Sequence, residues 1–172
     1  MIAKEYRNML DSGKRQEFDT GCVRDSDEGK LEWSLFPPCV WELVLLDPVA
    51  PSEDQSVVTL VTQWLRGCAP MTQVLDNAIK NWGVEPLAIW IAKGADKYEP
   101  FNWTRGMPVS RCVDSLGRHL HAVVLERDDE DHRAVAMCNM AFIAHYQEAM
   151  PWLDDMKDVY HRKEKPEVFS SS

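Results

Sequence analysis

The sequence predicts a mostly α-helical protein that folds as a compact helical bundle with two polar loops. Apolar residues recur at helical spacing in nearly every segment between residues 56 and 149. Glycine, proline or charged turns separate these segments, as at Gly67, Gly83 and Pro108. Together, the spacing and the breaks favour several short helices over a sheet.

The chain has 172 residues, which is enough for one domain around one core. We expect residues 1–16 to form an N-terminal arm and residues 161–172 to form an exposed tail. Residues 17–160 are then a single helical domain.

The first half of that domain alternates short apolar segments with turns. A short apolar run at 40–46 is interpreted as a helix, although its length does not separate helix from strand. Residues 56–66 predict a helix, because Val57, Leu60, Val61 and Trp64 share one face. Further helices are predicted at 70–82 and 86–93, and the latter is expected to end at Gly94.

Two longer helices follow a polar and aromatic loop at 95–107. Pro108 opens the first, at 108–126, which has apolar residues at Cys112, Leu116 and Leu120. An acidic turn at 127–131 precedes the second, at 131–149, where Asp129 or Asp131 can cap the helix. This second helix is apolar nearly all round, which is typical of the centre of a bundle or of an oligomer interface.

The overall charge excludes some classes of partner. The net charge is −9 and the pI is about 5.0, so no basic face for duplex nucleic acid is expected. A small anionic ligand needs only a few local cations or a metal ion. The five cysteines form no close CxxC pair and are interpreted as free thiols in a reducing compartment. Because no signal peptide or membrane span is visible, we expect a cytoplasmic protein.

The helix at 108–126 has a second, polar face. Asp114, Arg118 and His121 recur at i, i+4 and i+7, and His119 lies beside them. A solvated face with an Asp114–Arg118 ion pair explains this pattern equally well.

The following helix contains a polar residue that needs a partner. Asn139 lies in a nearly all-apolar segment, and His132 precedes it by seven residues, on the same face. A buried amide without hydrogen bonds costs roughly 1–3 kcal/mol. Two helices joined by a short turn are expected to pack antiparallel, which would bring both residues to the polar face of the preceding helix. The simpler alternative for Asn139 is an interhelical hydrogen bond.

This combination of residues suits cleavage of a nucleoside triphosphate between its α- and β-phosphates. Such a reaction needs charge neutralisation and an oriented water, which carboxylate-bound Mg²⁺, or Mn²⁺ or Co²⁺, can supply. The expected metal ligands are Asp114, Glu130 and Asp131, and the expected catalytic residues are Asp114, His119 and His132. The expected substrate-binding residues are Lys30, Lys97, Tyr98, Asn102, Trp103, Arg111, Arg118 and Asn139. As alternatives, Lys30 is a solvated lysine, and Phe101 and Trp103 anchor their loop in the core.

Four blocks of sequence resemble the phage-type dATP/dGTP diphosphohydrolase family, in its N-terminal domain. They are Thr20-Gly21-Cys22-Val23-Arg24-Asp25 with Glu28-Gly29-Lys30, Gly94-Ala95-Asp96-Lys97-Tyr98 with Asn102-Trp103 and Gly106, Ser110-Arg111 through Asp114-Ser115 to Arg118-His119-Leu120, and Asp129-Glu130-Asp131-His132 with Asn139. The resemblance covers residues 20–38 and 93–148. It implies hydrolysis of dATP or dGTP to the monophosphate and diphosphate, and a MazG-like fold by analogy.

The chain departs from the family pattern at three places. Residues 39–90 are interpreted as an insertion, Ser34 replaces an aspartate, and Cys138 replaces a tryptophan. Two other functions therefore stay open: a phage protein that sequesters a nucleotide without cleaving it, and a helical assembly protein. All three functions are compatible with the homo-oligomer that we expect.

Overall fold

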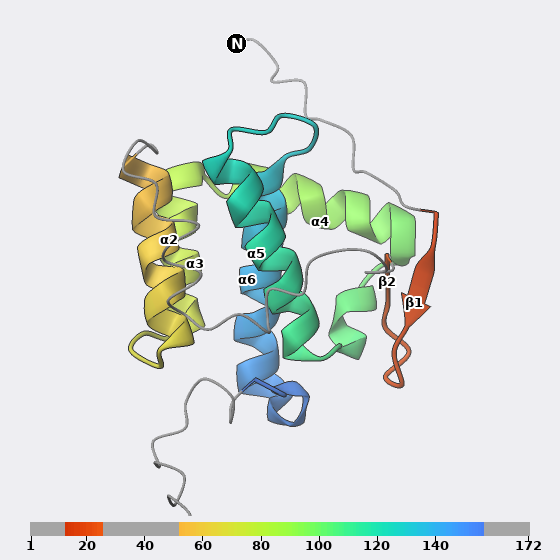
Figure 1. Ribbon diagram of the computed structural model, residues 1–172. Helices are drawn as coiled ribbons and strands as arrows, with labels where there is room; N and C mark the ends of the chain where they lie inside the picture. The colour runs from red at the N-terminus through yellow and green to blue at the C-terminus, as the bar shows by residue number, and fades with distance from the viewer. Residues whose placement is uncertain (1–12, 26–51, 157–172) are drawn as a thin grey trace, which may run out of the picture.

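The structure is a computed structural model that describes residues 13–25 and 52–156, and within them it is mostly helical, as predicted (Figure 1). Five α-helices are present in this part of the chain: α2 (Ser52–Leu65), α3 (Met71–Trp82), α4 (Glu85–Tyr98), α5 (Val109–Val124) and α6 (His132–Ala149). Two short 3-10 helices, η2 (Asn102–Arg105) and η3 (Pro151–Leu153), complete it. The run at 40–46, Lys30, Ser34 and residues 161–172 lie outside the described residues.

Helix α6 lies at the centre of the bundle and packs against α3, α4 and α5. Its position follows from its composition, because a helix that is apolar on most sides must be covered on most sides. Met137, Met140 and Ile143 are fully buried. Helices α2 and α3 pack together on one side of α6, and α4 lies across the other side (Figure 1).

Helices α5 and α6 are antiparallel, as the short turn between them predicted. Two contacts establish this direction: the start of α6 meets the end of α5 at His132 and His119, and Asn139 meets Ser115 further along. Asp131 caps α6 by accepting a hydrogen bond from the backbone amide of Ala134, at 3.1 Å. Asp131 is therefore the capping residue, one of the two alternatives that the sequence left open.

The structure differs from the predicted elements in two places. Helix α4 does not end at Gly94 but continues through it to Tyr98, so the polar loop that follows is shorter than expected. A glycine inside a helix is tolerated at a cost of about 1 kcal/mol, so it does not by itself end one. The second difference lies near the N-terminus, where strands β1 (Arg15–Glu17) and β2 (Val23–Asp25) form an antiparallel hairpin in a segment interpreted as arm and loop.

None of the helices in the described part of the chain is long and apolar enough to cross a membrane.

The cysteines in the described residues are free, as predicted, and all but one are buried. Cys22, Cys112 and Cys138 are buried, whereas Cys68 is exposed. Burial raises the pKa of Cys112 and of Cys138 to about 12, and it raises the pKa of Cys22 as well. Because the thiolate is the reactive form, the buried thiols should react slowly.

We expect a C39S/C68S variant to react with fewer than one equivalent of a thiol-specific disulfide reagent at pH 8 while folded. In denaturant the same variant should react with three equivalents, one for each buried cysteine. Rapid reaction of all three thiols in the folded protein would contradict their burial.

Candidate functional site

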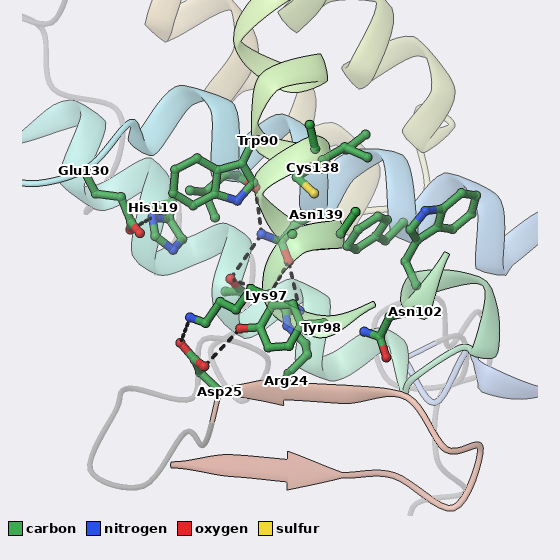
Figure 2. Close-up of a pocket in the computed structure, with 18 of the residues that line it drawn as sticks. Arg24, Asp25, Trp90, Lys97, Tyr98, Asn102, His119, Glu130, Cys138 and Asn139 are labelled. Carbon is green, nitrogen blue, oxygen red and sulfur yellow. Dashed lines mark hydrogen bonds and ion pairs between the residues drawn. The ribbon is translucent and has the colours of Figure 1, made fainter. Parts of the chain in front are cut away.

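A large cavity lies between the hairpin, α4, η2, α5 and α6 (Figure 2). Its volume is about 980 Å³, at the upper end of the range for small-molecule sites, about 300–1,000 Å³. The groove between α5 and α6 forms one wall, through Ser115 and His119 on α5 and through His132, Asn139 and Phe142 on α6. Part of the polar face predicted for α5, namely Arg118 and His119, therefore meets His132 and Asn139 of α6 in one cavity.

The cavity does not share the acidic bias of the whole chain and has a small excess of basic residues. The full sequence has 28 acidic and 19 basic residues. By contrast, five lysine and arginine residues line the cavity together with four carboxylates: Arg24, Lys97, Arg111, Arg118 and Arg127 against Asp25, Glu99, Asp129 and Glu130. A locally basic cavity of this kind can bind a polyphosphate although the protein is acidic overall.

The hairpin is attached to the bundle through Asn102 of η2. The Asn102 amide donates to the carbonyl oxygen of Val23 at 2.9 Å, and its oxygen accepts from the Val23 amide at 3.1 Å. Arg105 donates to the carbonyl oxygen of Gly21, and Thr20 donates to that of Gly106. The Asn102 side chain thus pairs with the backbone of Val23 as a neighbouring strand would, and it also lines the cavity.

The hairpin in turn places Arg24 against the buried Asn139. Both terminal nitrogens of Arg24 donate to Oδ1 of Asn139 at 3.2 Å, and one of them also donates to the Ser115 hydroxyl at 3.3 Å. The Asn139 amide nitrogen donates to Ser115 and to the carbonyl oxygen of Val135, at 3.1 and 2.8 Å. Asn139 therefore has the structural hydrogen bonds that its burial required, and one of its partners is a cation that lines the cavity.

Asp25, the neighbour of Arg24, holds two of the predicted substrate-binding residues. Its carboxylate accepts from Lys97 at 2.9 Å and from the Tyr98 hydroxyl at 3.0 Å (Figure 2). Burial alone would lower the pKa of Lys97, but the hydrogen bond to Asp25 and the neighbouring Tyr98 raise it above its ordinary value. Lys97 is therefore a cation at neutral pH, oriented at the cavity wall by Asp25.

Aromatic side chains line the end of the cavity near η2. The Trp103 ring stacks on that of Phe142, with centroids 5.8 Å apart and an angle of 11° between the planes. The Tyr146 hydroxyl donates to the carbonyl oxygen of Trp103 at 2.6 Å, and burial raises the pKa of that hydroxyl well above its usual range. Phe101 is 72% exposed, so it does not anchor the loop in the core, whereas Trp103 is packed against α6.

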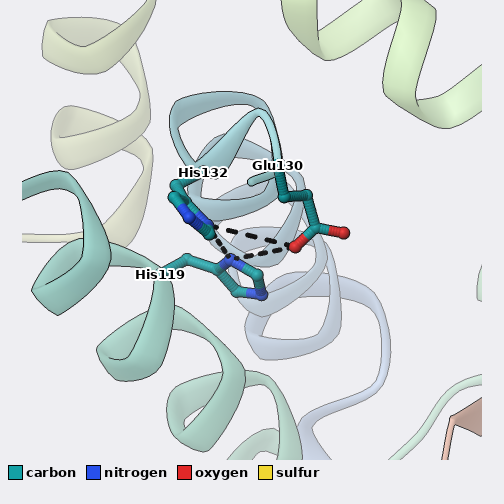
Figure 3. Close-up of side chains that lie close together, drawn as sticks. All are labelled: His119, Glu130 and His132. Carbon is teal, nitrogen blue, oxygen red and sulfur yellow. Dashed lines mark hydrogen bonds and ion pairs between the residues drawn. The ribbon is translucent and has the colours of Figure 1, made fainter. Parts of the chain in front are cut away.

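At another part of the cavity, His119, Glu130 and His132 point toward one another (Figure 3). The two Nδ1 atoms are 3.0 Å apart, and Oε2 of Glu130 lies 3.6 Å from that of His119 and 3.9 Å from that of His132. Nε2 of His132 lies 3.0 Å from a carboxylate oxygen of Asp129. The hydrogen bond from His132 holds the pKa of Asp129 below its ordinary value.

This cluster differs from the predicted metal ligands in two of three positions. Glu130 belongs to it, but Asp131 caps α6 and Asp114 is buried without lining the cavity. The other two members of the cluster are His119 and His132, which were predicted as catalytic residues. Asp131 is absent from the cluster because its carboxylate is held at the start of α6, where it caps the helix. Glu130 precedes the cap, so its carboxylate can point toward the two histidines.

Arg111 and Arg118, which were also predicted to bind the substrate, both line the cavity. Arg111 donates to the side chain of Gln16 in β1 at 2.8 Å and lies over the Phe18 ring. His121 does not line the cavity, although it shares the predicted polar face.

Sequence reasoning missed Arg24, Asp25, Ser115 and Asp129 as parts of the site. The sequence did contain an indication of Arg24 and Asp25, because both lie in the block at 20–25 that resembles the family. It also indicated that the buried Asn139 needs a partner. Periodicity could not show that Arg24 is this partner, because it relates only residues within one helix or strand.

Comparison with known proteins identifies a family. The sequence model of the family dATP/dGTP diphosphohydrolase, N-terminal, matches residues 70–156. No curated protein and no solved structure is significantly similar to the chain. The match includes residues 70–90, part of the segment interpreted as an insertion, and it does not include residues 20–38.

The matched segment contains α3 to α6 and the His119–Glu130–His132 cluster, and it spans about half of the chain. It supports a nucleotide diphosphohydrolase function. The chain belongs to the dATP/dGTP diphosphohydrolase N-terminal family.

Proposed function

We propose that the chain hydrolyses purine deoxynucleoside triphosphates to the monophosphate and diphosphate in the cavity between the hairpin and helices α4, α5 and α6. The observation that carries this proposal is the cavity lining, which combines five basic side chains with the His119–Glu130–His132 cluster. The family match supports it, because that family is named for this reaction. We propose that such an enzyme serves phage nucleotide metabolism, as the resemblance implies.

The basic side chains would hold the triphosphate. Arg118 and His119 of α5 both line the cavity, so the Arg118 guanidinium would contact a phosphate bound in it. Lys97 approaches from α4, where Asp25 orients it. Cations on opposite walls of a cavity neutralise a polyphosphate and hold it in one orientation.

The cluster fits a divalent metal ion, because two imidazole nitrogens and a carboxylate oxygen face a common point. His119, Glu130 and His132 would hold the ion. When bound, it would neutralise phosphate charge and make a water molecule more acidic. In the overall reaction, water supplies an oxygen to one phosphorus atom and the bridging P–O bond breaks. The electron pair of that bond stays on the bridging oxygen of the leaving group, and one proton is released.

The aromatic end of the cavity would hold the base. Along α6, His132 and Phe142 are ten residues apart, about 15 Å at the helical rise. The Trp103–Phe142 stack thus lies well apart from the cluster, with the Arg24–Asn139 contact between them. Stacking of a base on an aromatic side chain contributes about 1–3 kcal/mol.

The experiment is incubation of the purified chain with each of the four deoxynucleoside triphosphates and a divalent metal, with separation of the products by anion-exchange chromatography. We expect equimolar monophosphate and diphosphate, with dATP or dGTP cleaved fastest. Release of inorganic phosphate alone, or no product from any nucleotide, would contradict the proposal. Tight binding of an unaltered nucleotide would favour sequestration, and no binding at all would favour an assembly protein.

The contribution of the cavity cations is tested by Arg118→Ala. We expect kcat/KM for the best substrate to fall about 10- to 100-fold, because one phosphate contact is lost. Lys80→Ala is the matched control, since Lys80 is an exposed cation on α3 that pairs with Asp76 and does not line the cavity. Equal activity of the two variants would remove Arg118 from the site.

A further inference from the structure

We infer that His119, Glu130 and His132 form a site for a transition-metal ion, of the Zn²⁺ or Co²⁺ class, and not a site for Mg²⁺. The inference deepens the proposed function and rests on it for the role of the ion. The binding itself is measured without a nucleotide, so the two can fail separately.

The three ligand atoms are spaced for a single ion. They form a triangle with sides of 3.0, 3.6 and 3.9 Å. The point equidistant from its corners is about 2.1 Å from each atom, which is the length of a zinc–nitrogen or zinc–oxygen bond, about 2.0–2.2 Å. One such ion would therefore reach all three atoms at its normal bond lengths.

Asp129 lies behind His132, on the side of the ring away from the other two ligands. Nε2 of His132 lies 3.0 Å from the acceptor-only carboxylate of Asp129, so Nε2 carries the hydrogen. In the neutral ring, the Nδ1 lone pair is then directed at His119 and Glu130. A carboxylate behind a histidine in this way is the usual outer partner of a metal ligand, because it sets the tautomer and strengthens the ligand.

The chemistry of the donors favours a transition metal over Mg²⁺. Mg²⁺ prefers octahedral oxygen ligands and retains its waters, whereas imidazole nitrogens suit zinc and its neighbours in the first transition row. Two of the three donors in this cluster are imidazoles. The exposed fractions of the three side chains are 18%, 8% and 8% for His119, Glu130 and His132. Burial from bulk water adds to the preference for an ion that exchanges water for protein ligands.

The number of ligands fits a catalytic metal ion. Three protein donors leave at least one coordination position open, which is typical of catalytic sites and not of structural ones. All three residues line the cavity, so the open position would be accessible from the space in which we place the triphosphate.

The test is metal binding to the full chain after removal of metals with a chelator. Calorimetric titration with Co²⁺ and Zn²⁺, with the visible absorption of Co²⁺ as a second readout, should show one ion per chain. Zn²⁺ should displace Co²⁺, and millimolar Mg²⁺ should not. Absence of stoichiometric Co²⁺ and Zn²⁺ binding, or displacement of Co²⁺ by Mg²⁺, would overturn the inference, even if the protein hydrolysed nucleotides with Mg²⁺.

Two matched pairs of variants locate the site. His119→Gln should abolish Co²⁺ binding, whereas His121→Gln, the same change two residues away on α5 and outside the cavity, should not. Asp129→Asn should weaken binding about 10- to 100-fold through His132, whereas Asp128→Asn should leave it unchanged. Asp129 and Asp128 are both exposed, so neither change is expected to unfold the protein. Wild-type affinity in both His119→Gln and Asp129→Asn would refute the assignment.

Discussion

Replacing Arg24 by methionine should destabilise the protein by about 2–3 kcal/mol, because it leaves the buried Oδ1 of Asn139 without its charged partner. The hairpin should detach more readily from α5 and α6 as a result. Because Arg24 also lines the cavity, nucleotide hydrolysis should fall by more than the loss of folded protein explains. Urea unfolding and product release from the same preparations measure the two effects.

The matched control is Arg15→Met on the neighbouring strand. Arg15 forms an ion pair with Asp25 at 2.9 Å, but its side chain is 33% exposed, so its loss should cost less than about 1 kcal/mol. Two further changes, Asn139→Leu and Ser115→Ala in the Arg24→Met background, should together recover part of the stability, because the three polar side chains that bond to one another are then all absent. If Arg24→Met were as stable as Arg15→Met, the Arg24–Asn139 contact would not hold the hairpin in place.

Replacing Gly106 by alanine should have a comparably large effect on stability, about 1–3 kcal/mol. Gly106 has a φ of +84° and a ψ of 151°, a conformation that residues with a side chain adopt only at a cost of roughly 1–3 kcal/mol. An added Cβ would also collide with a terminal methyl group of Leu153 and would lie 2.9 Å from the sulfur of Met150. Both atoms lie toward the ends of flexible side chains, which can move aside at a small cost, so the backbone conformation accounts for most of the effect.

Gly94→Ala provides the control in the same family block. Gly94 lies inside α4, and a Cβ added there would have no neighbouring atom within 4 Å, so alanine should stabilise the protein by about 0.5–1 kcal/mol. Thermal unfolding of the two variants should therefore move in opposite directions. A Gly106→Ala variant with wild-type stability would show that η2 and the end of α6 adjust easily to the extra methyl group.

The helices were the most predictable part of the fold. The segments at 70–82, 108–126 and 131–149 correspond closely to α3, α5 and α6, because amphipathic spacing reports directly which face of a helix is buried. The hairpin was missed because strands of three residues are too short to show an alternating pattern.

The candidate site could be predicted only where it lies on helices. The sequence by itself determined that Asn139 and His132 share a face of one helix and that this face meets the polar side of the preceding helix. Only the tertiary structure decided that Arg24, 115 residues away, is the partner of Asn139. It also decided that Glu130 joins two histidines while Asp131 caps α6. Periodicity orders side chains along one helix, but the direction of a side chain in a turn, and its partner in a distant strand, depend on how the elements pack.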